Sequence, residues 1–204
     1  MDCAKVGQLI LQLRQEKGLT QLQLADKLHI SNKTVSKWEH GRGCPDVSLW
    51  EDLAKLLGAD ILKLLQGELT PNRPDVGKLT NLKFYVCPSC GNILTGTGAA
   101  SIACCGRQLR PLSPSEDGAN HLPKIAEVED EYYVTLEHEM QKDHYLLFAA
   151  CVNDDSIWLN RLYPEQSPAF RLPRMKRGAK LYLYCTKHSL FKYNIQSLLP
   201  PKQR

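Results

Sequence analysis

A cluster of four cysteines restricts the fold of this chain more than any other feature of its sequence. Half of its eight cysteines fall within the 19 residues from position 87 to position 105. They form a C-x-x-C-G motif and, after twelve further residues, a C-C-G motif. Four thiolates can close one tetrahedral site for iron or zinc, whereas a redox-active dithiol, the alternative, would not require the second pair. We expect one metal ion bound by Cys87, Cys90, Cys104 and Cys105.

Composition places the chain among ordinary globular proteins. Of its 204 residues, 43% are hydrophobic and 24% are charged, which excludes a disordered tail, a collagen and a coiled-coil rod. No apolar run is long enough to span a bilayer, and the first residues lack the order of a signal peptide, so we expect a cytoplasmic protein that does not enter a membrane. Stable disulfides are rare in that reducing compartment, so Cys3, Cys44 and Cys151 are expected to be ordinary thiols.

Two segments that contain proline and glycine, 70–77 and 111–118, are predicted linkers. They divide the chain into three predicted domains, at residues 1–69, 78–112 and 119–199. The predicted fold class is therefore multidomain with both α and β structure. It comprises an N-terminal five-helix bundle, a small four-cysteine metal domain and a C-terminal immunoglobulin-like β-sandwich.

The first domain has the sequence pattern of short helices. From Val6 onward, apolar residues recur at i, i+3, i+4 and i+7, the spacing of one helical face. Thr20 and Gln23 have the spacing of a capping box that begins a second helix, and Ser31 can cap a third. Later leucines predict two more helices. Periodicity alone does not distinguish this arrangement from an ordinary helical bundle.

The identities of the residues, unlike their periodicity, favour one particular helical fold. Residues 13–21, LRQEKGLTQ, and residues 31–42, SNKTVSKWEHGR, closely resemble the phage repressor/Cro-like (XRE) helix-turn-helix family. The resemblance implies that the helix over residues 32–40 enters the major groove of DNA, and that Arg14 and Glu39 pair within the domain. The lysines of this helix can donate to guanine acceptors, although they can also lie on a solvated helix face. Gln21, at the start of the preceding helix, is placed to touch a phosphate with its side chain and its backbone N–H. The candidate DNA contacts are Gln21, Asn32, Lys33, Thr34, Ser36, Lys37 and Arg42.

Charge is distributed unevenly along the chain. Residues 1–70 carry nine basic and nine acidic side chains, so affinity for double-stranded DNA must come from a local patch and from dimerisation. We therefore expect a homodimer. Residues 171–204 carry nine basic and no acidic side chains, a field that attracts an anion or DNA phosphates, or is simply a solvated surface.

The C-terminal segment combines strand-length runs of Tyr, Val, Ile and Leu with most of the histidines. Several short strands within about 80 residues predict an all-β sandwich. All four histidines beyond residue 100 lie here, with a cysteine three residues before the last of them. One histidine is more often an ordinary core or surface residue, but four with a nearby cysteine favour a metal site. The candidate ligands are His121, His138, His144, Cys185 and His188.

Both metal-binding patterns occur, in this order, in one known family. Residues 84–91 with the later C-C-G motif resemble desulforedoxin, and the histidine motifs resemble superoxide reductase, so residues 84–199 together resemble desulfoferrodoxin. The resemblance implies a rubredoxin-like iron at the four cysteines and a second, ferrous iron held by four histidines in a plane and an axial Cys185. Ala119-Asn120 departs from the family's Glu-Lys pair, whose lysine guides superoxide, and Ser189 replaces a glycine.

These patterns support one main hypothesis and two alternatives. The main hypothesis is a DNA-binding transcriptional regulator with an iron module that responds to superoxide or peroxide. One alternative is a superoxide reductase, supplied by an electron donor, that carries an added DNA-binding domain. The other is a regulator whose metals are only structural. The absence of a lysine at position 120 favours regulation over rapid turnover, while the complete five-ligand set argues against metals that are only structural.

Overall fold

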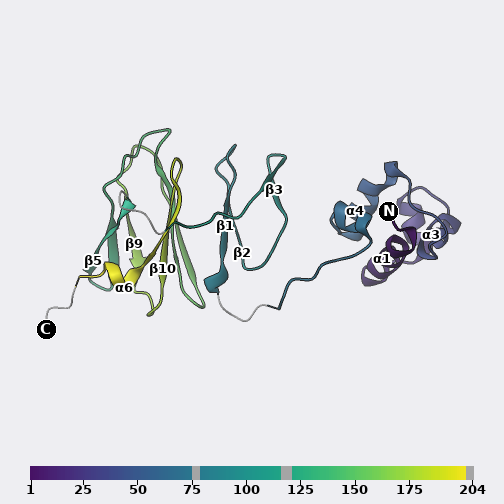
Figure 1. The fold of residues 1–204 in the computed structure, drawn as a ribbon, viewed down its shortest axis with the longest axis horizontal. Coiled ribbons are helices and arrows are strands. Elements are labelled where there is room, and N and C mark those ends of the chain that lie inside the picture. Colours follow the sequence, from purple (N-terminus) through teal and green to yellow (C-terminus); the bar gives the residue numbers. More distant parts are fainter. Residues whose placement is uncertain (75–78, 116–120, 201–204) are drawn as a thin grey trace. The chain divides into compact units, whose positions relative to one another are not determined.

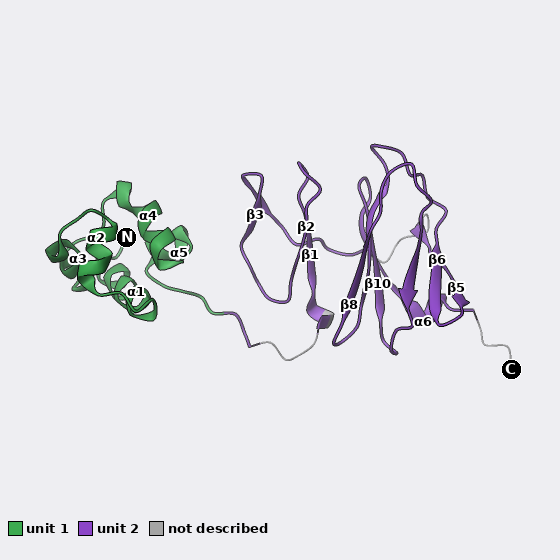
Figure 2. Cartoon of the chain, turned by 180° about the vertical axis from the view of Figure 1, so that it is seen from behind, with its two compact units in different colours: residues 1–71 green, residues 72–204 purple. Residues whose placement is uncertain are grey.

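In a computed structural model, the chain forms two compact units, Met1–Pro71 and Asn72–Arg204 (Figure 2). The structure describes residues 1–74, 79–115 and 121–200. These residues contain six α-helices and eleven β-strands, with five of the helices in the first unit and all of the strands in the second. The mixed α and β class predicted from the sequence is thus confirmed. None of the described helices is long and apolar enough to cross a membrane.

The first unit is built of short helices whose starts are capped by side chains. In the predicted capping box, the Thr20 hydroxyl accepts from the Gln23 N–H, and the Gln23 side chain accepts from the Thr20 N–H. Asp2 caps the first helix and Ser31 caps the third. The helices are α1 (Cys3–Glu16), α2 (Gln21–Lys27), α3 (Asn32–Glu39), α4 (Trp50–Leu57) and α5 (Ile61–Gln66), with a 3-10 turn at Val47–Leu49 before α4 (Figure 1).

One apolar core, to which all five helices contribute buried side chains, holds this unit together. Helix α1 packs closely on α3, and glycine at position 7 permits this packing because any side chain there would collide with the Trp38 carbonyl oxygen. Arg14 and Glu39 form two hydrogen bonds, with Nε–Oε1 at 2.5 Å and Nη2–Oε2 at 3.1 Å. This buried pair confirms the pairing expected from the family resemblance, and it ties the end of α1 to the end of α3.

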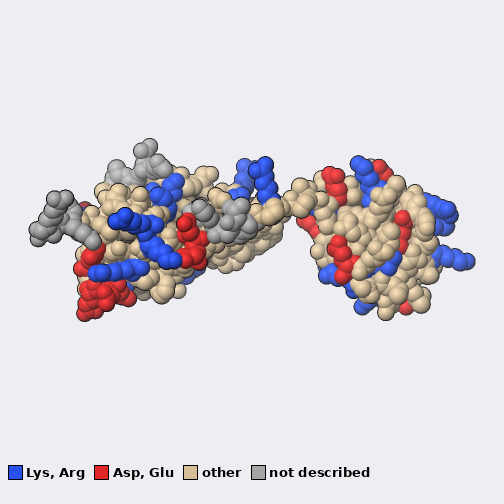
Figure 3. All heavy atoms as spheres, turned by 90° about the horizontal axis from the view of Figure 1, so that it is seen from below, with Lys and Arg blue, Asp and Glu red and all other residues tan. Residues whose placement is uncertain are grey.

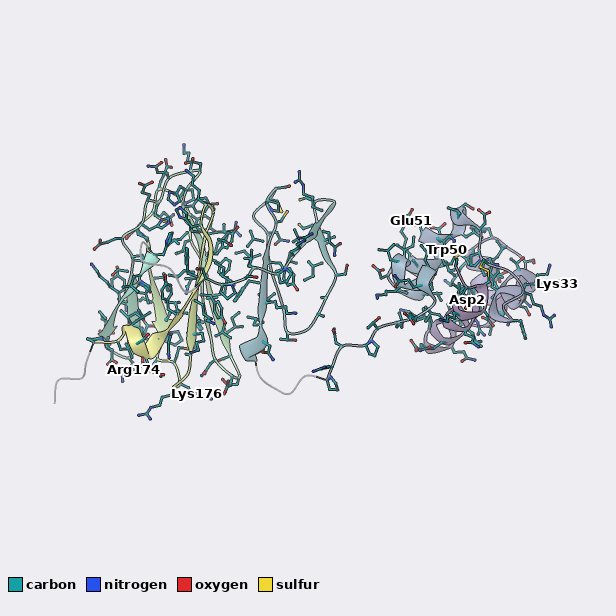
Figure 4. The ribbon with its side chains drawn as sticks, viewed as in Figure 1. Asp2, Lys33, Trp50, Glu51, Arg174 and Lys176 are labelled. Atoms are coloured by element: carbon teal, nitrogen blue, oxygen red, sulfur yellow. A yellow bond between two sulfur atoms is a disulfide. The ribbon has the colours of Figure 1, made fainter. Side chains whose placement is uncertain are left out.

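One expectation about this unit is wrong. Cys3 and Cys44, which were expected to be ordinary thiols, form a disulfide, with their Cα atoms 5.1 Å apart (Figure 4). They are separated by 41 residues, and no motif in the sequence relates them. The close approach of Ala4 to Gly41 brings the start of α1 beside the loop that follows α3. Cys151 is a free thiol buried in a strand, as expected.

The second unit begins with a 3-10 turn at Leu79–Asn81 and two small antiparallel hairpins. The first pairs β1 (Lys83–Val86) with β2 (Ile93–Gly96), and the second pairs β3 (Ile102–Cys104) with β4 (Arg107–Leu109). Their shared apolar cluster is small, since its buried members are Tyr85, Cys87 and Leu109. So little buried surface favours an additional cross-link, such as a metal ion, for stability.

Two antiparallel sheets form the rest of the unit, in the strand orders β5-β6-β9 and β11-β10-β7-β8. Buried side chains from both sheets form one core, which accounts for the predicted strand-rich segment. The strands are β5 (Lys124–Val128), β6 (Glu131–Thr135), β7 (Leu146–Val152), β8 (Ile157–Arg161), β9 (Ala169–Pro173), β10 (Lys180–Cys185) and β11 (Ser189–Asn194).

Strand β7 shows how the hairpins join the sheets. All seven of its residues are buried, because both faces of its sheet are covered. The three-stranded sheet covers one face, and on the other the Phe84 ring of β1 lies 5.2 Å from the Phe148 ring, measured between centroids. A continuous apolar run is what a strand buried on both faces requires.

The sixth helix was not expected from the sequence. Helix α6 (Ile195–Leu198) follows the last strand, and the Asn194 side chain caps it by accepting from the Gln196 N–H. The sequence analysis predicted five helices, all in the first domain. A four-residue helix has too few periodic positions to be recognised from its pattern.

Candidate metal centres and DNA-binding surface

The clustered cysteines lie at the tips of the two small hairpins. In the β1–β2 loop, the Gly91 N–H bonds to the Cys87 carbonyl at 2.9 Å. In the β3–β4 turn, Cys105 and Gly106 have φ values of 51° and 72°. Two successive positive φ values are typical of a type I′ hairpin turn, and this turn brings the sulfurs of Cys104 and Cys105 to 4.0 Å. We call Cys87, Cys90, Cys104 and Cys105 the four-cysteine cluster.

The spacing of the four sulfurs fits a single metal ion. They all lie within 4.8 Å of one another, and the sulfurs of Cys90 and Cys104 are 3.6 Å apart. In a tetrahedral site with metal–sulfur bonds of about 2.3 Å, neighbouring sulfurs are about 3.8 Å apart. The structure therefore brings all four predicted ligands together at a separation that suits iron or zinc.

Electrostatics in the four-cysteine cluster also favours a cation. The backbone N–H groups of Cys90 and Ser89 lower the pKa of Cys87 to about 6. Hydrogen bonds with Cys90, then with Cys87 and Cys104, raise the pKa of Cys105 to about 12. Four adjacent thiolates repel one another unless a cation neutralises them, so metal binding would release protons from the cluster.

The second candidate centre lies at one end of the sandwich, where β10 ends and β7 and β11 begin. We call His121, His138, His144, Cys185 and His188 the histidine–cysteine cluster. Its four rings form a closed circuit, in which centroids are 4.9 Å apart from His121 to His138, 4.7 Å to His144, 4.9 Å to His188 and 5.0 Å back to His121. One ligand atom from each of the five residues lies within 4.8 Å of the others.

Unpaired buried nitrogens show that this cluster fits a metal. Both ring nitrogens of His138, and Nε2 of His144, are buried without a hydrogen-bond partner among the described residues. An unpaired buried polar atom costs about 1–3 kcal/mol, a penalty that coordination would remove. His144 Nδ1 lies 3.3 Å from a Glu139 carboxylate oxygen, an outer contact that orients a ligating imidazole.

The histidine–cysteine cluster is ready to bind a cation at neutral pH. Burial, followed by the nearby His138, His188 and His144, lowers the pKa of His121 to about 4. Burial also lowers the pKa of His138. Both rings are therefore neutral at pH 7, the form that ligates a metal. Cys185 is fully buried and His188 is exposed, so the cluster extends from the sandwich core to the surface.

The two departures from the family pattern have different outcomes. Ser189, directly after His188, has φ of 72°, which is the left-handed conformation that glycine adopts without steric cost. The backbone thus keeps the shape of a glycine turn although the residue is serine. Ala119 and Asn120 lie outside the described residues.

Exposed polar side chains on α3 and in the loop after it form a candidate DNA-binding surface. The basic side chain of Lys33 points away from the unit (Figure 4). On the face that Figure 3 shows, acidic and basic side chains are interspersed. The exposed predicted contacts are Asn32, Lys33, Lys37 and Arg42.

Three other predicted contacts are half-buried or already form hydrogen bonds within the domain. Thr34 and Ser36 are half-buried, and the Thr34 hydroxyl lies 2.8 Å from the Ser31 hydroxyl. The Gln21 amide nitrogen donates to Glu39 at 2.7 Å, so the domain already uses the side chain that was expected to reach a phosphate. The Gln21 backbone N–H lies in the first turn of α2, where helices leave such groups without an intrahelical partner.

Comparison with known proteins separates the two parts of the chain. A helix-turn-helix family matches residues 10–64. The HTH-type transcriptional activator BcrR of Enterococcus faecalis is 40% identical over 81 residues, which are 37% of this chain and only 40% of that protein. A desulfoferrodoxin homolog of Archaeoglobus fulgidus is 25% identical over 118 residues, and the desulfoferrodoxin of Desulfarculus baarsii is 28% identical over 121 residues. Each alignment covers 54% of this chain and 94% of the relative.

These matches agree with the geometry of the two units. The helix-turn-helix match lies within the unit that carries α2 and α3. The desulfoferrodoxin matches span nearly the whole length of those relatives. Both candidate metal centres lie in the second unit of this chain. The chain therefore joins a helix-turn-helix domain to a desulfoferrodoxin-like module.

Proposed function

We propose that this chain is a sequence-specific DNA-binding transcriptional regulator whose C-terminal module binds iron and responds to superoxide or peroxide. The observation that carries the proposal is the histidine–cysteine cluster, with three unpaired buried nitrogens, in a chain that also holds a helix-turn-helix domain. The desulfoferrodoxin relatives favour iron as the ion.

In this proposal α3 lies in the major groove. Its asparagine pairs with adenine, and its two exposed lysines donate to guanine acceptors. The first turn of α2 and the loop after α3 hold phosphates, through a backbone N–H and a guanidinium group respectively. The proposed contacts are Gln21, Asn32, Lys33, Thr34, Ser36, Lys37 and Arg42.

The two metal centres have different tasks. The four-cysteine cluster holds iron, or zinc as the alternative, and stabilises the two hairpins around it. Ferrous iron bound at the histidine–cysteine cluster would supply one electron to superoxide. The chain's own part there is to present four imidazoles, to place the buried Cys185 sulfur beside them and to orient His144 through Glu139.

The domain plan follows from these tasks. We assign a DNA-binding domain to residues 1–69, a four-cysteine metal domain to 78–112 and an immunoglobulin-like sandwich to 119–199. Two chains form a homodimer, and oxidation of the iron changes the charge of the module in each. A regulator needs only a different operator affinity in the two states. The linker between the DNA-binding domain and the four-cysteine metal domain includes residues 75–77, which lie outside the described residues.

A second candidate function is a superoxide reductase that carries an added DNA-binding domain. The complete five-residue cluster favours it, because the cluster contains every metal ligand that the resemblance to superoxide reductase implies. An enzyme must in addition attract the anion and be re-reduced quickly by an electron donor. Asn120 supplies no positive charge in front of His121, which favours the regulator.

One preparation can separate the two functions. Superoxide consumption and affinity for a duplex enriched from a random-sequence library are measured on the same iron-loaded protein, reduced and oxidised. We expect slow consumption and an operator affinity that changes with oxidation. His138→Ala, which removes a ligand, should abolish the part of the change that depends on iron, whereas Glu165→Ala, an exposed residue outside the cluster, should leave it intact. Fast superoxide consumption, together with an operator affinity that does not depend on oxidation, would refute the regulator and support the superoxide reductase.

A further inference from the structure

The disulfide between Cys3 and Cys44 has no part in either metal centre. It joins the first residue of α1 to the loop between α3 and α4. Both residues are half-buried, and neither belongs to the buried core of the first unit. The other described cysteines are differently placed, since four belong to the four-cysteine cluster, Cys185 to the histidine–cysteine cluster, and Cys151 lies in the sandwich core.

The first unit does not depend on this disulfide for its fold. Its core contains buried side chains from all five helices, and the Arg14–Glu39 pair independently connects α1 with α3. Close backbone packing at Gly7 and Gly41 holds the same two helices together. The cysteines thus remain neighbours when the sulfurs are reduced, which is the condition for a bond that opens and closes reversibly.

The disulfide fixes the loop that carries one of the proposed DNA contacts. At the end of α3 the Gly41 N–H bonds to Trp38 O at 2.8 Å, and the Arg42 N–H bonds to Lys37 O at 2.9 Å. Arg42 is thus held to α3 on one side and is two residues from Cys44 on the other. A loop that is ordered before binding loses less conformational entropy when it meets DNA.

We infer that Cys3 and Cys44 form a reversible disulfide, closed by hydrogen peroxide and opened by thiol reductants, which raises operator affinity by fixing the Arg42 loop. The inference rests on the proposed function, because DNA-binding proteins work where thiols are kept reduced and disulfides there are usually transient or redox-sensing. It adds a second redox-responsive site to the chain, in the DNA-binding domain itself.

The chemistry balances with peroxide as the oxidant. One cysteine thiolate attacks a peroxide oxygen, which gives a sulfenic acid and releases water once a proton is taken up. The second thiol displaces the sulfenic hydroxyl as water and forms the sulfur–sulfur bond. Two thiols and one hydrogen peroxide thus give one disulfide and two waters. Peroxide is also the product of one-electron reduction of superoxide, so the module proposed above would generate this oxidant.

The test compares the reduced and the oxidised full-length chain. Protein reduced with dithiothreitol and desalted without oxygen is divided, and one half is treated with hydrogen peroxide. Peptide mass spectrometry after alkylation with a maleimide shows whether the two cysteines are linked, and fluorescence anisotropy with the selected duplex gives Kd. We expect the linked form to bind about threefold to tenfold more tightly, and dithiothreitol to reverse the change.

Serine variants give the matched controls. Cys3→Ser, Cys44→Ser and the double variant, each combined with His138→Ala so that the histidine–cysteine cluster is incomplete, should all bind like the reduced protein and ignore peroxide. The double cysteine variant should bind no more weakly than either single one. Unequal single variants would mean that the side chains, rather than the bond, affect binding. Separate alkylation of both cysteines after peroxide, or equal Kd values for the linked and reduced chains, would also overturn the inference.

One more variant separates this inference from the proposed function. His138→Ala, in which the histidine–cysteine cluster is incomplete, should still form the disulfide and bind more tightly after added peroxide. If only iron oxidation controls affinity, this variant will not respond to peroxide, and the inference fails while the proposed function stands. If no redox state of the wild-type chain selects a duplex, both fail together.

Discussion

At the scale of single residues, the exposed lysines of α3 provide the most direct test of DNA recognition. Lys33→Ala or Lys37→Ala should each cost about 1–3 kcal/mol of operator affinity and relax specificity at one base pair. Quantitative footprinting on the selected duplex measures both effects. Lys55→Ala is the matched control, because Lys55 is an exposed lysine of α4 that pairs with Glu51. An unchanged footprint in the Lys33 and Lys37 double variant would show that α3 does not read DNA.

Ser189 offers a stability test at the turn beside the second metal centre. Its φ of 72° places a Cβ in the left-handed region, so Ser189→Gly should stabilise the second unit by about 0.5–1 kcal/mol. Urea unfolding followed by tyrosine fluorescence gives the difference. Ser113→Gly, at an exposed serine without a positive φ, should give no gain. Equal shifts in both variants would contradict this explanation.

His121 predicts how the metal-free protein responds to acid. Its pKa is about 4 in the folded chain, against an ordinary value of 6.5, so the unfolded chain binds an extra proton between these values. Stability is therefore complete above pH 6.5 and falls as the pH is lowered toward 4. Urea midpoints of the metal-free protein across this range measure the slope. His121→Asn should flatten it, and an unchanged slope in that variant would assign the pH dependence to other groups.

At the scale of elements, the β3–β4 hairpin depends on its metal. Each strand has three residues and the surrounding apolar cluster is small. Cys104→Ser, or removal of the metal with a chelator, should therefore lower amide-exchange protection in this hairpin by a factor of at least about ten while α1–α5 stay protected. Ser89→Ala, at an exposed residue that lies between Cys87 and Cys90 in the chain and is not a candidate ligand, should leave protection unchanged. Protection that survives chelation would show that packing alone holds the hairpin.

At the scale of the whole molecule, a neutral DNA-binding domain requires a partner. Residues 1–70 carry equal numbers of acidic and basic side chains, so one copy gains little from bulk charge. We predict that two chains bind an inverted repeat with half-site centres about 34 Å apart, one helical turn. Footprinting combined with the mass of the complex measures spacing and stoichiometry. One chain on a single unrepeated site would refute the homodimer.

The sequence alone was informative wherever function is encoded by neighbours in the chain. The capping box at Thr20 and Gln23 was predictable because it is made within one helical turn. The two ligand sets were predictable because metal ligation permits few residue types. The strand-rich C-terminal segment was predictable from its runs of Tyr, Val, Ile and Leu, although these runs did not reveal that β7 is buried on both faces or which segment covers its second face.

Tertiary structure decided the features that join distant segments. Cys3 and Cys44 meet because glycine at position 41 lets α3 and its loop approach α1, and no local pattern reports such an approach. The Gln21 side chain is held by Glu39, a partner 18 residues away, although its position suggested a phosphate contact. Local patterns specify which residues can form a helix, a turn or a ligand pair. Only packing determines which of them become neighbours, because contacts between distant segments depend on the shape of the whole core.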